Sequence, residues 1–303
     1  MKSNNKTRAR LTSSFLVGLL IISSCGATSN PAAKINGEEI SREELEQTIT
    51  ELSDAGQTPV VDGEIAGDTA RSVLGALIQG QASLQLLADY DQQITQEDRD
   101  SVKSSLSQNT DTAEFTDHLK NLIINLNAGT LALARILPPD AKTVATMYEK
   151  APASLGVMCI RHLVVKEEAK AKEALKKFSN GADFATLAGE YSIEPNAKQS
   201  GGALSGADNA CMKLGEYQSG FDPLFTAGAL LAKPGVAFGP VKSSFGYHLI
   251  YVRPFVEVAE DISTLLTSAT GETLLDGYIA TSKIVIDSAY GHWDAASGAV
   301  VTN

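Results

Sequence analysis

The chain has 303 residues, a formal net charge of −11 and a hydrophobic content of 43%. This length is about twice that of a typical single domain, so two folding units are expected. The hydrophobic content is that of an ordinary globular protein. The acidic balance leaves no basic stripe that could displace counterions, so nucleic acid is not expected as a partner.

Residues 1–24 have the pattern of a secretion signal. A basic start precedes the apolar run Phe15–Ile22, which is too short to span a bilayer. Residues Ile22 to Cys25 resemble the bacterial lipobox, and residues 25–32 would form a tether. We expect an extracytoplasmic protein that is anchored by acyl chains on Cys25 to the outer face of the bacterial cell membrane. The alternative is an ordinary cleaved signal in which this cysteine is incidental.

Removal of the signal takes away four basic residues and no acidic one, so the formal net charge changes from −11 to −15. An acidic body would be repelled by an anionic lipid surface. The membrane contact that we expect is therefore the lipid anchor alone.

Residues 33–150 are predicted to form a helical, chaperone-like domain that begins with a small hairpin. The Asn36-Gly37 turn joins two short strands within residues 33–40, and Ser41 with Glu44 forms a capping box. Residues 56–67 are expected to form a loop. Apolar spacing predicts helices over 68–90, from Thr95 to about 108, from Thr112 through Ala134, and from about 140 to 150.

Beyond Pro254 the sequence predicts one helix over about 258–280 and a strand at 284–286. The only tryptophan, Trp293, lies in the tail that follows, and a solvated terminus has little reason to be aromatic. We therefore expect the C-terminal residues 257–303 to pack back on the N-terminal domain, with residues 284–286 pairing beside residues 33–35. Residues 151–256 would then be an insertion.

Two histidine-containing strands enclose this insertion. His162 lies in the apolar segment 157–165, and His248 lies in the segment 245–252. An Ala/Lys/Glu-rich helix, the sequence GADFATLAGEYSIEP and a GGAL turn lie between them. This order and spacing resembles the parvulin (PpiC-type) peptidyl-prolyl isomerase domain. The arrangement of the whole chain resembles the extracytoplasmic foldases of the SurA/PrsA group.

The resemblance implies an α+β fold, in which a parvulin-like domain with a small antiparallel sheet and surrounding helices is inserted into a discontinuous helical domain. It also implies a peptidyl-prolyl cis-trans isomerase that acts on unfolded or newly exported polypeptides with X-Pro bonds. Isomerisation has a barrier of ~18–20 kcal/mol that falls as the amide twists, and it requires no covalent step. No cofactor is therefore expected.

The family's site has two facing histidines beside an acidic or thiol group, next to an apolar pocket. The matching polar positions, which we predict to be catalytic, are His162, His248 and Glu194. The matching substrate-binding positions are Leu204, Tyr217, Phe221 and Phe245. The alternative for the histidine pair is structural, because such a pair can simply brace two strands. The sequence departs from the family pattern at Glu194, one methylene longer than the usual Asp, and at Ala203, where an acidic residue is usual.

Two cysteines remain besides Cys25, namely Cys159 and Cys211. In an oxidising compartment a disulfide between them is expected, and two separately buried thiols are the alternative. There is no CxxC motif, and no metal site is expected.

Three functions are compatible with these patterns. The first is a membrane-anchored foldase with isomerase activity, and the second is a non-catalytic holdase that uses the parvulin fold for binding. The third is an assembly or structural lipoprotein that binds one folded partner. An exposed apolar groove around Leu77, Leu84, Leu119 and Ile123 would favour the first two.

Overall fold

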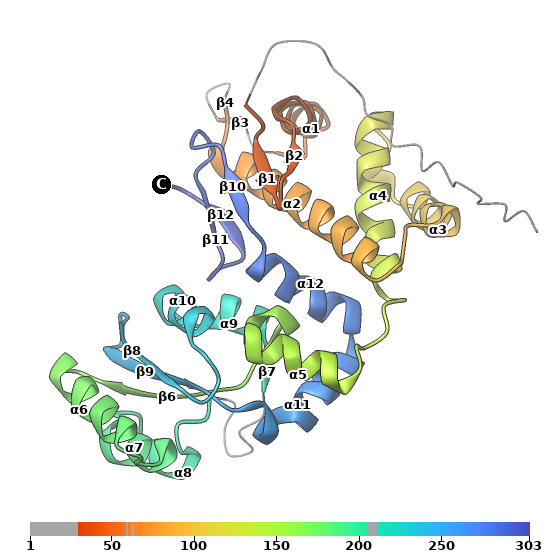
Figure 1. Ribbon diagram of the computed structural model, residues 1–303. Coiled ribbons are helices and arrows are strands. Elements are labelled where there is room, and N and C mark those ends of the chain that lie inside the picture. Colours follow the sequence, from red (N-terminus) through yellow and green to blue (C-terminus); the bar gives the residue numbers. More distant parts are fainter. Residues whose placement is uncertain (1–29, 59, 62–63, 205–210) are drawn as a thin grey trace, which may run out of the picture.

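The computed structural model describes residues 30–58, 60–61, 64–204 and 211–303. The predicted signal, Cys25 and most of the tether lie outside these ranges. Two lobes are visible in Figure 1, with α12 between them. The upper lobe contains both ends of the described chain, and the lower lobe contains the middle of the sequence. The predicted α+β fold, with small antiparallel sheets among helices, is confirmed.

The upper lobe contains a three-stranded sheet of order β10-β1-β2, which joins the two ends of the described chain. Strands β1 (Ala33–Ile35) and β2 (Glu38–Ile40) form the predicted hairpin, whose turn residues Asn36 and Gly37 both have positive φ. Strand β10 (Ile284–Ile286) pairs antiparallel with β1, with Ala33 opposite Ile286. This pairing confirms the predicted return of the C-terminal segment.

The helices of the upper lobe begin at side-chain caps where the sequence provides them. Ser41 caps α1 by accepting from the backbone N–H of Glu44, and Thr95 with Asp98 forms the capping box of α3. The helices are α1 (Arg42–Asp54), α2 (Gly67–Asp89), α3 (Gln96–Ser107) and α4 (Asp117–Leu133). None of the helices in the described part of the chain is both long and apolar enough to cross a membrane.

Two predictions for this lobe need correction. The segment predicted as a loop contains a two-stranded hairpin, β3 (Val60–Val61) with β4 (Glu64–Ile65). Helix α4 begins at Asp117 because Thr116 caps it, and Thr112, where this helix was expected to start, is the last residue of a short 3₁₀ turn, η1 (Thr110–Thr112). In both places, the ends of the helices and strands are set by local turn and cap residues, which the apolar spacing does not reveal.

The predicted helix over 258–280 is two helices, α11 (Phe255–Ser268) and α12 (Thr270–Thr281). The chain turns at Ala269, where φ is −161° and ψ is 65°. After the turn, Gly271 lies against the last turn of α4, so closely that an added Cβ would sit 2.1 Å from the Leu133 carbonyl oxygen. The break between α11 and α12 therefore allows α12 to pack against α4. Helical periodicity in the sequence does not predict such a tertiary contact.

The tail ends in a hairpin of β11 (His292–Asp294) and β12 (Ala299–Val301). Val300 is buried in the core of the upper lobe, and Trp293 packs against the same core while partly exposed. These contacts join the tail to the helices and strands of the upper lobe.

The lower lobe contains a three-stranded antiparallel sheet of order β6-β9-β8. Its strands are β6 (Ile160–Val165), β9 (Tyr247–Val252) and β8 (Ala237–Lys242). The predicted strand over 157–165 divides at Cys159, because β5 (Val157–Met158) turns away to pair with β7 (Met212–Lys213).

Helices cover both faces of this sheet (Figure 1). On one face lie α6 (Glu168–Ser179), α7 (Phe184–Tyr191) and α8 (Ala197–Ser200), and on the other lie α9 (Leu214–Gly220) and α10 (Pro223–Leu231). Leu163, Val165 and Leu249 pack toward α6 and α7. Alternation along β6 directs the neighbouring residues, including His162, to the opposite face.

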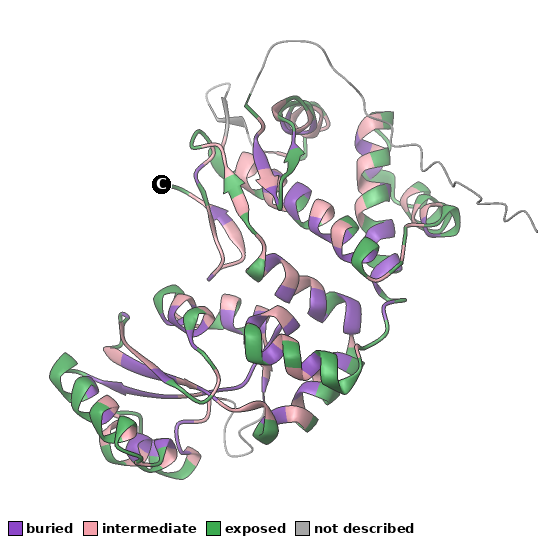
Figure 2. Cartoon of the chain, in the orientation of Figure 1, coloured by how far each residue is buried: buried purple, intermediate pink, exposed green. Residues whose placement is uncertain are grey.

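A shared core joins the lobes across the predicted boundary at residues 150 and 151. It includes residues of α2, α4, α5 (Ala141–Lys150), α11 and α12, and it continues into β5 and β6. Figure 2 shows buried residues in α2, in α12 and along β6. Helix α12 packs on the backbone of η2 (Pro152–Leu155), where Gly277 leaves room that a Cβ, only 2.3 Å from the Ser154 carbonyl oxygen, would fill.

Candidate active site

The two predicted histidines meet on one face of the lower sheet. His162 of β6 lies opposite Ile250, and His248 of β9 lies opposite Val164, so the histidines form a diagonal cross-strand pair. Their Nδ1 atoms are 3.2 Å apart, and their nearly parallel rings have centroids 5.5 Å apart. His162 is 5% exposed and His248 is 4% exposed. The pair is thus almost completely removed from water.

The pair belongs to a longer chain of hydrogen bonds. His162 Nε2 is 2.9 Å from Glu194 Oε2, and His248 Nε2 is 2.6 Å from Ser243 Oγ. One arrangement of protons satisfies every contact: Ser243 donates to His248 Nε2, His248 Nδ1–H donates to His162 Nδ1, and His162 Nε2–H donates to Glu194. Each imidazole is then neutral and has one proton. This assignment is an inference from the network.

The electrostatics of the site agree with a neutral His248. Burial lowers the pKa of His248 from 6.5 to about 4, with a smaller contribution from the field of His162. The hydrogen bond from His162 is the main cause that lowers the pKa of Glu194. At neutral pH the chain therefore runs from a neutral buried imidazole to a carboxylate that is 42% exposed.

Two backbone segments fix the position of this network. Ser192 Oγ accepts the N–H groups of Val164 and Glu194, and Ile193 donates its N–H to the Val164 carbonyl, which holds the segment with Glu194 beside β6. The Gly-Gly turn lies along the same edge of β6, because the backbone groups of His162 and Val164 point to one side of the strand. Gly202, with φ at 81°, accepts the N–H of His162 so closely that a Cβ would lie 2.2 Å from the His162 carbonyl oxygen.

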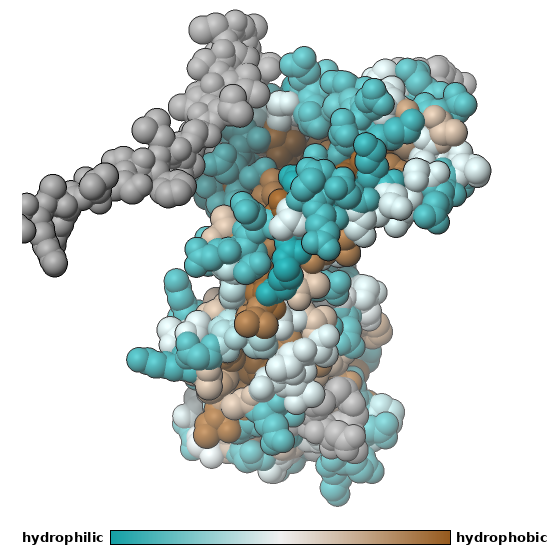
Figure 3. Space-filling view, turned by 90° about the vertical axis from the view of Figure 1, so that its right-hand side faces the viewer, coloured by the Kyte–Doolittle hydropathy of each residue, from teal (hydrophilic) through white to brown (hydrophobic). Residues whose placement is uncertain are grey.

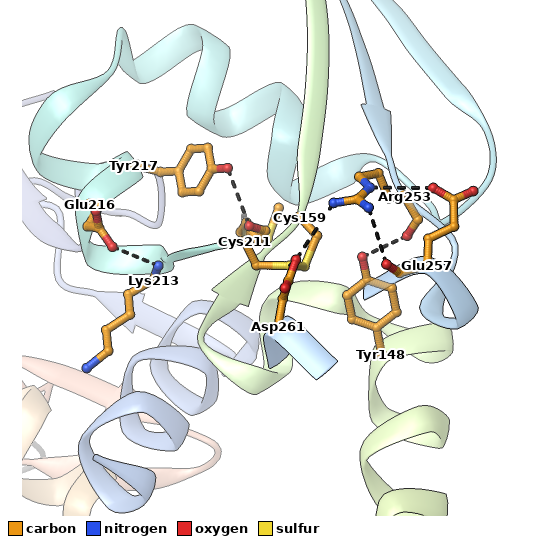
Figure 4. The surroundings of a disulfide bond; sticks show 10 residues. Tyr148, Cys159, Cys211, Lys213, Glu216, Tyr217, Arg253, Glu257 and Asp261 are labelled. Carbon is orange, nitrogen blue, oxygen red and sulfur yellow. Dashed lines mark hydrogen bonds and ion pairs between the residues drawn. A yellow bond between two sulfur atoms is a disulfide. The ribbon is translucent and has the colours of Figure 1, made fainter. Parts of the chain in front are cut away.

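An aromatic row leads from the histidine pair into the core. Phe225 contacts both imidazoles edge-on, with centroid distances of 5.3 Å to His162 and 5.1 Å to His248. Phe221 stacks between Phe225 and Tyr217. Tyr217 is 1% exposed, and its hydroxyl points at the Met158 carbonyl oxygen (Figure 4). The structure thus places Tyr217 behind Phe221 in the core and not in an accessible pocket wall.

The other predicted pocket residues are more accessible. Phe221 and Leu204 are partly exposed, and both pack against the core of the lower lobe. Phe245 lies in the turn between β8 and β9 and is 63% exposed. Residues 205–210, which follow Leu204, lie outside the described part of the chain.

Two residues of this site were not predicted from the sequence. Ser243 is buried, and its hydroxyl also accepts the N–H of Phe245, so it joins the turn to His248. Its place in a Ser-Ser pair just before Phe245-Gly246 was an available signal of a polar turn. Phe225 had no such signal, because its contacts depend on how α10 packs over the sheet.

A disulfide joins Cys159 and Cys211, which are 52 positions apart in the sequence (Figure 4). Both cysteines are buried, at 1% and 5% exposure. The bond connects the bend between β5 and β6 to the residue before β7. The covalent loop that it closes contains His162, Glu194 and Leu204.

The upper lobe has a separate groove of about 510 Å³ between α1, α2 and α4. Of the four residues predicted to line a groove here, Leu77 and Leu84 do so. Leu119 is buried in the lobe and Ile123 lines a neighbouring hollow, because the rotation of α4 presents Leu122 and Leu126 to the groove. Figure 3 shows hydrophobic side chains in a hollow of this lobe, among hydrophilic ones.

The comparisons with known proteins agree with the site geometry. Residues 165–254 match the family described as "Rotamase: PPIC-type PPIASE domain". This segment contains Glu194 and His248, and His162 lies just before it on β6. The match confirms the isomerase domain and the enzyme class that were predicted from the sequence.

Over its length, the chain is similar to foldases. It is 27% identical to "Foldase protein PrsA" of Clostridium kluyveri in an alignment 335 residues long, gaps included. The alignment covers 92% of this chain and 96% of that protein. It is 35% identical to the protein of the same name from Caldanaerobacter subterraneus subsp. tengcongensis over 147 residues, 45% of each chain. Among solved structures, PrsA from Bacillus subtilis covers 80% of this chain and 88% of its own, with 20% identity and a TM-score of 0.30.

Proposed function

We propose that this chain, which has a PpiC-type peptidyl-prolyl isomerase domain within a PrsA-like sequence, is an extracytoplasmic, lipid-anchored foldase. In this proposal the lower lobe isomerises X-Pro bonds in newly exported polypeptides, and the upper lobe holds those polypeptides while they fold. The observation that carries the proposal is the convergence of His162, His248 and Glu194 beside partly exposed apolar side chains.

The proposed mechanism is non-covalent. An X-Pro amide that twists out of plane loses resonance, and its carbonyl oxygen and nitrogen change in charge as it does so. Glu194, His162 and the neutral His248 would set a fixed electrostatic environment for that change, and their dipoles require no reorganisation because the network already holds them. Only contacts that are stronger in the twisted state than in the planar state speed the reaction.

The proline ring requires an apolar contact. Leu204, Phe221 and Phe245 are the predicted pocket residues with exposed surface, and we propose that they grip the ring. Tyr217 would act indirectly in this scheme, because it supports Phe221 by stacking on it at a centroid distance of 5.0 Å.

The isomerase activity is tested with a protease-coupled assay on proline-containing peptides, using the full mature chain. We expect a rate well above the uncatalysed background, and a large loss in the double variant His162→Ala/His248→Ala. The variant His292→Ala is the control, because this exposed histidine lies on β11 in the upper lobe. A wild-type rate equal to the background would rule out the enzyme and leave the holdase.

The holding function of the upper lobe is supported by the groove between α1, α2 and α4. Four leucines line it, Leu77, Leu84, Leu122 and Leu126, and concave apolar surface is what an unfolded segment can cover. A lipoprotein that binds one folded partner would not need such a groove. The test is suppression of aggregation of a reduced, unfolded protein. Leu84→Glu should weaken suppression of aggregation. It should not affect the peptide assay, because Leu84 lies in the upper lobe and is already 47% exposed, so the variant should still fold.

The membrane anchor is supported only by the sequence around Cys25. We expect a labelled fatty acid to be incorporated into the wild-type chain in a bacterial host, and no label in the variant Cys25→Ser. Incorporation that persists in the variant would rule out this lipidation site.

A further inference from the structure

His118 occupies a position between two carboxylates that the isomerase mechanism does not use. It lies in the first turn of α4, with Nδ1 2.9 Å from Glu51 Oε2 and Nε2 3.4 Å from Glu44 Oε1. Glu44 and Glu51 are seven residues apart on α1, so they lie on the same face of that helix. His118 therefore connects α1 to α4 at two points.

The contacts of Glu51 fix its carboxylate in place. The Thr116 hydroxyl at the cap of α4 donates to Oε2, and the Gln47 amide donates to Oε1 at 2.9 Å. These two hydrogen bonds are the main reasons that the pKa of Glu51 falls to about 2, and His118 contributes less. The Glu51 side chain is 14% exposed, so it presents a fixed negative charge to His118.

Both ring nitrogens of His118 face carboxylate oxygens, and only the imidazolium can donate to both. A neutral imidazole has one N–H, which leaves a lone pair directed at an anion on the other side. The hydrogen bond to Glu51, followed by the fields of Glu51 and Glu44, raises the pKa of His118 despite partial burial. Among the described residues, these two glutamates are the charged groups whose fields shift it.

This connection lies at the side of the apolar groove in the upper lobe. Glu44 lines the groove from α1, and Leu122, one turn after His118 on α4, lines it from the other wall. Helix α2 supplies Leu77 and Leu84 between them. The separation of α1 from α4 at His118 therefore affects the width of the groove.

We propose that His118 is a proton-operated clasp, which holds α1 against α4 when the imidazole is protonated and allows the groove to widen when the proton leaves. The proposal rests on the proposed function in one respect: the ligand of the groove is taken to be an apolar segment of an unfolded chain. The clasp itself is a property of His118, Glu44 and Glu51.

The direction of the pH effect follows from the two pKa shifts. The folded pKa of His118 lies above its ordinary value of 6.5, so its contribution is complete below 6.5 and is lost as the pH rises through the folded value. The folded pKa of Glu51 lies below its ordinary value of 4.5, so its contribution is lost only as the pH falls toward 2. The stabilisation from the clasp is therefore complete from about pH 4.5 to 6.5, and the clasp opens as the pH rises through the folded pKa of His118.

The test measures the proton and the movement separately, on the full mature chain. NMR of labelled histidine side chains, with His118 assigned by its loss in His118→Gln, should give a titration midpoint above those of unfolded histidines. Hydrogen exchange in α1 and in the first turn of α4, corrected for intrinsic rates, should accelerate several-fold from pH 5.5 to pH 8.5.

Three variants sharpen this test. His118→Gln should exchange at pH 5.5 as fast as the wild type does at pH 8.5, and Glu51→Gln should lower the His118 midpoint. His118→Arg, a permanent cation, should remove the pH dependence and leave the segments protected. His292→Gln, the change of an exposed histidine on β11, should exchange as the wild type does.

Binding of the dye Nile red gives the readout for the groove. We expect more dye to bind at pH 8.5 than at pH 5.5 in the wild type, and the same amount at both pH values in His118→Arg. If Leu84→Glu leaves dye binding unchanged, the groove is not the apolar site and the proposed holding function fails, whereas the exchange data still test the clasp. A His118 midpoint at or below 6.5, or pH-dependent exchange that persists in His118→Gln, would overturn the clasp.

Discussion

His248 in the lower lobe and His118 in the upper lobe respond to protons in opposite ways. His248 is 4% exposed, and its ring nitrogens face another imidazole and a hydroxyl, so burial keeps it neutral. The His118 side chain is 29% exposed and has a carboxylate on each side, so the charged form is favoured. Solvent access and the charge of the partners, not the residue type, decide the protonation state.

The comparison implies that acid affects the two lobes differently. Below pH 6.5, His248 binds a proton in the unfolded chain but stays neutral in the folded chain until the pH falls to about 4. Acid therefore favours the unfolded state and destabilises the lower lobe. Over the same range His118 is protonated and connects α1 to α4. Mild acid should therefore weaken the isomerase lobe while it tightens the helical lobe.

The largest expected effect comes from removing the disulfide. Cys159 and Cys211 close a loop with a sequence separation of 52, and the chain-entropy model assigns about 4 kcal/mol to such a loop. Calorimetry of Cys159→Ala/Cys211→Ala should show a lower unfolding temperature for the lower lobe. The exchange rate around His118 should stay at the wild-type value. Equal losses in both lobes would show that the shared core makes them a single cooperative unit.

Acidification should give the next largest effect. The folded pKa of His248 is about 4 and its ordinary value is 6.5, so lowering the pH across this interval costs the lower lobe up to about 3 kcal/mol. Calorimetry at pH 7 and pH 4.5 measures it. In His248→Gln, which cannot titrate, the difference should shrink. A stability that is constant over this range would mean that His248 takes up its proton in the folded state.

The sequence predicted the position of this buried pair better than its protonation state. The resemblance to the parvulin domain was enough to predict that His162 and His248 face each other, and the only tryptophan, Trp293, was enough to predict that the tail packs back. The neutral state of His248 depends on its burial, to which Phe225 of α10 contributes, and the position of Phe225 follows from packing that spacing does not encode.

The same limit explains the wrong boundaries. The helix predicted over 258–280 breaks because α12 must approach the backbone of α4 and η2, and the loop predicted at 56–67 contains a hairpin of two very short strands. Tyr217 was predicted as a pocket wall from its position in the family pattern. Its burial depends on Phe221 and Phe225, which form a stacked row beside it.

A smaller effect, on activity, should follow from neutralising Glu194. Glu194→Gln keeps the length of the side chain but removes the charge that receives the His162 hydrogen bond at 2.9 Å. Charge-assisted hydrogen bonds are about twice as strong as neutral ones, and we expect a loss of about tenfold in kcat/KM, which corresponds to about 1.4 kcal/mol. The protease-coupled assay measures it.

The matched control is Glu190→Gln, which removes an equally negative group that pairs with Lys177 on the surface of the same lobe. It should leave the activity unchanged. If both variants lose activity equally, the net charge of the lobe matters and the contact with His162 does not.

The smallest effect concerns the Ser243 hydroxyl that bonds to His248. Ser243→Ala removes the donor 2.6 Å from His248 Nε2 and leaves a buried acceptor unpaired, at a cost of about 1 kcal/mol. A hydrogen bond donated to the neutral imidazole disfavours its charged form, so its loss should raise the titration midpoint of His248 in NMR. Ser244→Ala, which removes a neighbouring hydroxyl that bonds to Asp222 instead, should not move that midpoint. An unchanged midpoint in both variants would leave burial alone responsible for the neutral state, and the contrast with His118 would then rest on solvent access.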